Sequence, residues 1–239
     1  MRTLLMPALC LLLAFFATSC NFTENITVNP DGSGKASFDL DGSQLMGMAG
    51  RQMADKKIDT TFTFKELFAK KKDSIARLPK AEQERLKSLE NMAVKMVVNA
   101  EDAQFNINVL NDFKKAGEIG DAMSAFKDIA AMKNPQKAES LGFLDNHSTV
   151  KYSYDGKSFK KNVEMKKNVA AQQDTLSMYK SMMEGSTYTV KYKFPKKIKK
   201  VSNPAAIISE DRKGLSLTYD LLEYLDHPTQ LALDVEFEK

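Results

Sequence analysis

Apolar and polar residues alternate along short segments of this chain, and tight-turn sequences separate one segment from the next. In the first case, residues 22–28 and 36–40 place apolar side chains at alternating positions. Asn29-Pro30-Asp31-Gly32 lies between them, and Pro and Gly supply backbone angles that a chain reversal requires. A period of two puts the apolar side chains on one face of a strand. The pattern therefore predicts a β-hairpin.

The same pattern recurs through the rest of the chain. Two more hairpins are predicted at residues 92–109 and 150–165, and strands at residues 188–194, 215–219 and 231–237. Strands that are joined by tight turns and carry one polar face form antiparallel sheets. Apolar residues at helical spacing predict helices at residues 43–53, 64–78, 79–90, 119–130 and 169–183.

These elements predict an α+β fold: a largely antiparallel sheet of β-hairpins with amphipathic helices packed on one face. Residues 20–239 are long enough for a single domain with a sizeable core. Residues 1–19 differ in character, because Arg2 precedes an apolar run at residues 4–17. That run is shorter than the roughly 20 residues that span a bilayer, and it fits a secretory signal peptide.

The predicted signal ends in Ala17-Thr18-Ser19-Cys20. Small residues before a cysteine resemble the lipobox of bacterial lipoproteins. Ala17 stands where the strictest form has Leu, a departure common in the Bacteroidetes version. The resemblance implies that residues 1–19 are removed and that Cys20 carries the lipid, palmitate among its acyl chains. Such multiple acylation anchors a domain stably to a membrane.

Cysteine usage supports the lipoprotein interpretation. The chain has two cysteines, Cys10 and Cys20, and Cys10 lies inside the predicted signal. A secreted eukaryotic domain of this size usually carries paired cysteines. The eukaryotic alternative is favoured by Asn-X-Ser/Thr triplets at Asn21, Asn25 and Asn146, although such triplets also arise by chance.

The charge balance bears on partners. Lys and Arg number 35 against 31 Asp and Glu, a net charge of +4, which gives no case for a nucleic-acid partner. No second apolar run reaches spanning length, so the lipid is the predicted membrane attachment.

His147 and His227 are the two histidines of the chain. Neither accompanies a nucleophile elbow or a catalytic cysteine, and a zinc site requires at least three N or S ligands. We therefore predict no catalytic residue, no metal site and no cofactor, and a protein that is not an enzyme. An enzyme that uses carboxylates alone stays as an alternative, because paired Asp and Glu leave little trace in a sequence.

Lysines gather around Phe194-Pro195. They are Lys191, Lys193, Lys196, Lys197, Lys199 and Lys200. On an edge strand, lysines discourage edge-to-edge pairing of sheets. Close to a membrane, they attract anionic headgroups. Both interpretations are open from the sequence.

The last quarter of the chain, residues 186–239, carries a resemblance to known lipoproteins. Its motifs are Tyr188-Thr189-Val190-Lys191-Tyr192-Lys193-Phe194-Pro195, Val201-Ser202-Asn203 and Leu217-Thr218-Tyr219-Asp220-Leu221-Leu222. They are similar to the closing segment of a group of Bacteroidetes lipoproteins and, less closely, to the LppM-type lipoprotein domain of actinobacteria. The LppM-type likeness implies an α+β fold similar to lipid-binding domains and transfers no catalytic residue.

The residues that follow the predicted anchor indicate on which side of the membrane the protein lies. Asn21-Phe22-Thr23-Glu24 lacks the acidic cluster that resembles a surface-export signal in Bacteroidetes, which favours a periplasm-facing lipoprotein. Methionine-rich helices suit adaptable apolar grooves. The sequence thus predicts a non-enzymatic envelope binding module for a lipid or apolar ligand, or for an envelope protein. The alternative is a structural or assembly subunit of an envelope protein complex.

Overall fold

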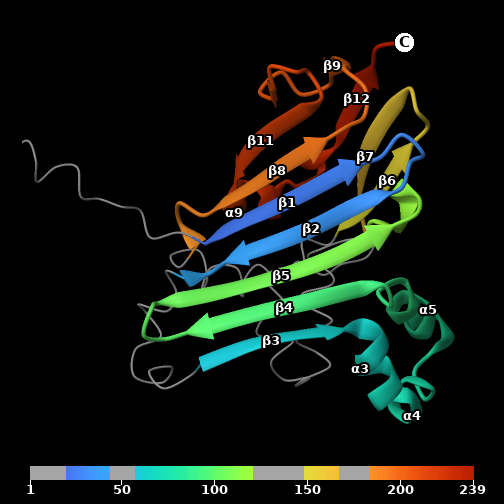
Figure 1. The fold of residues 1–239 in the computed structure, drawn as a ribbon, viewed down its shortest axis with the longest axis vertical. Helices are drawn as coiled ribbons and strands as arrows, with labels where there is room; N and C mark the ends of the chain where they lie inside the picture. The colour runs from blue at the N-terminus through green and yellow to red at the C-terminus, as the bar shows by residue number, and fades with distance from the viewer. Residues whose placement is uncertain (1–19, 44–56, 121–147, 167–182) are drawn as a thin grey trace, which may run out of the picture.

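The computed structural model describes residues 20–43, 57–120, 148–166 and 183–239, which form two β-sheets and several short helices (Figure 1). The predicted helices at residues 43–53, 119–130 and 169–183 lie almost entirely outside the described residues. The described strands include the three hairpins that alternation predicts, β1–β2, β4–β5 and β6–β7.

The larger sheet has eight strands and is mixed rather than wholly antiparallel. Its spatial order is β10 (Ile207–Ile208), β11 (Gly214–Asp220), β8 (Thr187–Lys193), β1 (Asn21–Val28), β2 (Gly34–Asp41), β5 (Gln104–Phe113), β4 (Met92–Asn99) and β3 (Lys57–Thr63). β1 pairs with β8 in parallel, with Asn21 opposite Thr187 and Thr27 opposite Lys193. No tight turn joins these two strands, so local turn signals do not reveal their pairing.

The smaller sheet has four antiparallel strands and lies behind the upper part of the larger sheet in Figure 1. Its order is β6 (Ser148–Tyr154), β7 (Ser158–Met165), β12 (Leu233–Phe237) and β9 (Ile198–Val201). The C-terminal strand β12 thus lies between β7 and β9, away from β11, although α9 and η4 alone separate the two in sequence.

The core lies between the inner faces of the two sheets. Inward residues of β1 and β8, such as Ile26 and Val190, are almost fully buried, as is Phe159 of β7. Outward residues of the same strands, such as Thr27 and Lys191, are exposed. The period-two alternation therefore has its expected cause, one buried and one solvated face for each strand.

The described helices do not show the predicted layer of helices on one face. α3 (Phe64–Lys70), α4 (Lys72–Ile75) and α5 (Lys80–Ser88) gather at one end of β3 and β4 (Figure 1). The predicted single helix at residues 64–78 breaks at Lys71, whose φ of −113° and ψ of 15° are not helical. α9 (Leu221–Asp226) follows β11, and the 3-10 turns η2 (Ala116–Glu118) and η4 (Pro228–Leu231) are the other elements of the described residues.

Candidate functional site

A buried carboxylate is the most unusual feature of the core. Glu24 lies on β1 in the same alternation as Phe22 and Ile26, so its side chain points between the sheets, where it is 1% exposed. Lys161 occupies the equivalent inward position on β7, two residues after Phe159, and is also 1% exposed. Charged side chains are almost never buried unless they are paired.

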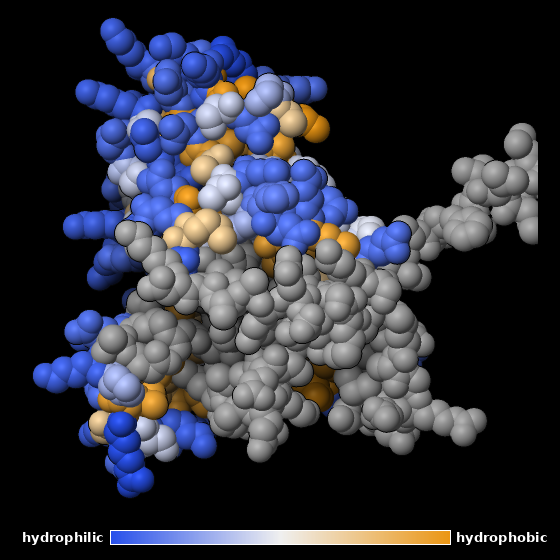
Figure 2. Space-filling model, turned by 180° about the vertical axis from the view of Figure 1, so that it is seen from behind, coloured by the Kyte–Doolittle hydropathy of each residue, from blue (hydrophilic) through white to orange (hydrophobic). Residues whose placement is uncertain are grey.

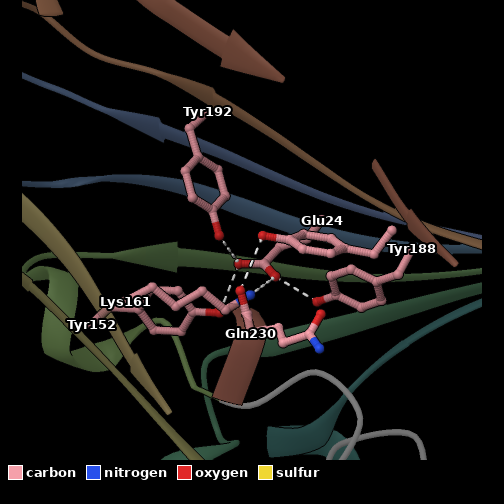
Figure 3. A network of polar contacts seen from close by, with 7 residues as sticks. Glu24, Tyr152, Lys161, Tyr188, Tyr192 and Gln230 are labelled. Carbon is pink, nitrogen blue, oxygen red and sulfur yellow. Dashed lines mark hydrogen bonds and ion pairs between the residues drawn. The ribbon is translucent and has the colours of Figure 1, made fainter. Parts of the chain in front are cut away.

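Glu24 and Lys161 meet across the interface between the sheets, together with three tyrosines (Figure 3). The Lys161 Nζ lies 2.6 Å from Glu24 Oε2, which also accepts a hydrogen bond of 2.5 Å from the Tyr188 hydroxyl. Tyr152 and Tyr192 donate to Glu24 Oε1 at 2.7 and 2.6 Å. We call these five residues the Glu24 cluster.

Aromatic rings surround the Glu24 cluster. The Lys161 Nζ lies 5.4 Å from the centre of the Tyr188 ring and 5.7 Å from that of Tyr152, within the range of cation–π attraction. Tyr188 packs against Tyr224 of α9 at 4.6 Å between ring centres, and Tyr192 packs against Phe159 at 5.4 Å. These contacts hold the hydroxyl groups in place around the carboxylate.

The electrostatics of the Glu24 cluster favour a carboxylate and neutral tyrosines. Burial raises the pKa of Glu24, but the charge of Lys161 and the hydrogen bonds outweigh it, so the pKa falls below its ordinary value of 4.5. Burial, and then the Glu24 charge, raise the pKa of Tyr152, Tyr188 and Tyr192 well above 10.0. The tyrosines are therefore the donors.

The number of hydrogen bonds that Glu24 accepts decides what the Glu24 cluster can do chemically. A carboxylate accepts about four hydrogen bonds, and Glu24 receives four, two at each oxygen. No acceptor position remains for the proton of a substrate. Among the described residues, Glu24 is the one carboxylate that is almost fully buried. The cluster instead connects β1 and β8 of one sheet to β6 and β7 of the other.

A second feature is a surface cleft of about 540 Å³ between α3–α4 and α5. Phe68, Ile75 and Leu86 give it an apolar floor. Its polar lining contains three lysines, two glutamates and one glutamine: Lys72, Lys80, Lys87, Glu84, Glu90 and Gln83. Ligand sites in proteins are commonly apolar hollows of roughly 300–1,000 Å³ with a few polar groups at the edge.

The sequence-predicted lysines are all exposed. Lys191 and Lys193 lie on β8, Lys196 and Lys197 in the turn after it, and Lys199 and Lys200 on β9. Lys199 contacts Glu236 at 3.7 Å. Because β8 runs parallel to β1, the turn that follows Lys193 lies at the opposite end of the sheet from Cys20.

Cys20 directly precedes β1 and is itself integrated into the fold. It is 4% exposed. Its backbone N–H donates to Ser186 Oγ at 2.9 Å, and its carbonyl accepts from the Thr187 N–H at 3.2 Å. Burial, followed by the charge of Asp41, raises the pKa of the Cys20 thiol. No linker therefore separates the predicted lipid site from the first strand.

Of the two histidines, His147 lies outside the described residues, and His227 ends α9, with its N–H donating to the Glu223 carbonyl. No group of three or more His, Cys, Asp or Glu that could hold a metal ion occurs in the described part of the chain. No helix within the described ranges is long and apolar enough to cross a membrane.

The comparisons with known proteins add one neighbour. No protein-family model matches the chain, and no curated protein matches it. The fold is similar to a solved structure of the folded domain of the LppM protein of Mycobacterium tuberculosis, at 6% identity and a TM-score of 0.39. The match covers 92% of this chain and 91% of the other. A likeness at this level assigns neither family nor function, and the relationship to Bacteroidetes lipoproteins stays a prediction.

Proposed function

We propose that this protein is a non-enzymatic lipoprotein of a bacterial envelope, anchored through Cys20 and facing the periplasm, that binds an amphiphilic ligand in the cleft between α3–α4 and α5. The observation that carries the proposal is the combination of apolar residues with an edge that has three lysines and two glutamates in that cleft. Phe68 and Ile75 would contact the apolar part of the ligand. Lys72, Lys80 and Lys87 would contact an anionic head.

The backbone N–H of Cys20 is compatible with acylation of the N-terminal amine. Acylation of the N-terminal amine produces an amide, which retains one N–H, so the hydrogen bond to Ser186 Oγ survives modification. Because the Cys20 side chain is buried, a lipid on its sulfur would require residue 20 to move out of this position. Cys20→Ser is expected to yield protein without lipid. Acylated, membrane-bound Cys20→Ser protein would contradict the anchor.

Ligand binding is tested with a fluorescent long-chain fatty acid and the uncharged alcohol of the same chain length. Ile75→Glu places a charge on the cleft floor and is expected to weaken both probes at least about tenfold, because burial of an unpaired charge is costly. Leu78→Glu is the matched control. Leu78 is 37% exposed and lies outside the cleft lining, so this variant should bind as the wild type does.

The lysines that line the cleft lead to a separate prediction. Lys80→Glu should weaken the fatty acid and leave the alcohol unchanged, since only the acid carries a charge. The proposal fails if neither probe binds the wild type, or if Ile75→Glu and Leu78→Glu bind equally well. If Lys80→Glu weakened binding of the fatty acid and of the alcohol equally, the lysines would not select an anionic head.

A further inference from the structure

An exposed apolar segment lies beside the lysine-rich turn. The loop from β9 into β10 contains Pro204, Ala205 and Ala206 and leads to Ile207 and Ile208. Ile207 is 74% exposed and Ile208 is 39% exposed. We call residues 204–208 the apolar loop. Figure 2 shows hydrophobic surface among hydrophilic side chains at the upper end of the molecule, where β9–β11 lie in Figure 1.

Basic side chains flank the apolar loop on both sides in sequence. Lys199 and Lys200 precede it on β9, and Arg212 and Lys213 follow it in the turn before β11. The Arg212 guanidinium donates to the Ile198 carbonyl at 2.6 Å, which holds that turn against β9. Acidic residues nearby are Glu210, Asp211, Glu236 and Glu238, two of which pair with Lys199 and Arg212. Lys193, Lys196 and Lys197 extend the basic surface.

The register of the larger sheet places this surface relative to Cys20. Ile207 is paired with Ser216 of β11, Ser216 with Lys191 of β8, and Lys191 with Asn25 of β1. Ile207 is therefore at the level of Asn25, which is four residues along β1 from Asn21. β10 is three strands away from β1. With a rise of about 3.3 Å per residue and about 4.8 Å between strands, Ile207 lies ~20 Å from the start of β1. A bilayer that holds a lipid on Cys20 is therefore within reach of the sheet edge formed by β10.

We propose that the apolar loop and its flanking basic side chains form a second membrane contact, in which Ile207 and Ile208 insert at the interface of an anionic bilayer. Apolar side chains surrounded by lysines fit this interface because the alkyl parts enter it and the ammonium groups stay at the headgroups. A membrane is favoured over a protein partner by the excess of basic groups. This inference goes beyond ligand binding in the cleft.

The test measures co-sedimentation of the unacylated chain, residues 20–239, with sucrose-loaded vesicles. This chain contains every described strand and helix, and circular dichroism checks that each variant is folded. The wild type should bind vesicles of phosphatidylcholine mixed with phosphatidylglycerol, and bind vesicles of phosphatidylcholine alone at least about tenfold more weakly. Ile207→Asp should lower the partition coefficient about tenfold, and Lys196→Glu at least about fivefold.

Ile58→Asp is the matched control, because Ile58 is 37% exposed on β3, the opposite edge strand of the same sheet. It should partition as the wild type does. The inference is overturned if the wild type does not bind the anionic vesicles, or if Ile207→Asp and Ile58→Asp bind equally. Failure of the wild type to bind would direct the search for the partner of this surface to proteins. None of these outcomes depends on the fatty-acid assay.

Discussion

Replacing Lys161 with Met tests the role of the Glu24 cluster. Met has a similar length and keeps the apolar part of the side chain, so the change removes the charge with little change in packing. Removing one partner of a buried ion pair costs about 3–5 kcal/mol, because the other charge stays buried without compensation. Near neutral pH we expect Lys161→Met to lower the free energy of unfolding by this amount.

The pH dependence of that loss identifies its cause. In the wild type, the Glu24 pKa is below 4.5, so the stability that Glu24 contributes is present above pH 4.5 and is lost as the pH falls through the folded-state pKa. In Lys161→Met the opposing charge is absent, so we expect burial to raise the folded-state pKa of Glu24 above 4.5. The free energy of unfolding then decreases by up to about 1.4 kcal/mol per pH unit above pH 4.5, until the pH passes the raised pKa.

Urea denaturation followed by circular dichroism, from about pH 5 to about pH 8, measures this effect. Lys160→Met is the matched control: the neighbouring side chain points outward and contacts Asp234 at 3.6 Å, so its loss should cost less than about 1 kcal/mol at every pH. A difference between wild type and Lys161→Met that is constant over this pH range would refute the reasoning. So would an equal loss in Lys160→Met.

Three further predictions follow from the same core. Tyr188→Phe leaves Glu24 Oε2 with Lys161 as its partner and should cost about 1–3 kcal/mol of unfolding free energy by urea denaturation. In a spectrophotometric alkaline titration, Tyr152, Tyr188 and Tyr192 should stay protonated until the protein unfolds, since their pKa values are raised; stability should therefore fall as the pH rises above 10.0. Gly34→Ala should prevent normal folding, because a Cβ there would overlap the Thr27 carbonyl oxygen and the Phe113 ring, and soluble yield and circular dichroism would report it.

The hairpins could be predicted from the sequence because their signals are local. Asn29-Pro30-Asp31-Gly32 and Asp155-Gly156 lie between alternating segments, and the structure pairs those segments as β1–β2 and β6–β7. The parallel pair β1–β8 has no such signal, since the paired residues Asn21 and Thr187 are 166 residues apart in sequence. The second sheet covers part of the face for which helices were predicted, because apolar alternation does not say what packs against it.

The Glu24 cluster was missed, although the sequence contains a signal for it. Glu24 and Lys161 each interrupt an apolar alternation at an inward position, between Phe22 and Ile26 and between Phe159 and Val163. Two inward charges of opposite sign on different strands indicate a buried pair, because neither is tolerated alone. The sequence contains no comparable signal for the cleft. The cleft depends on the break between α3 and α4 at Lys71, where the sequence predicts one continuous helix.

The central position of β1 has a consequence for how the chain folds. β1 precedes the other described strands in the chain, yet Glu24 pairs with residues that follow it by 128, 137, 164 and 168 positions. Contacts of such sequence separation slow folding, and until β8 arrives one edge of β1 is an unpaired template for other strands. We therefore expect slow folding after synthesis, with β1 prone to aggregation until β8 has paired with it.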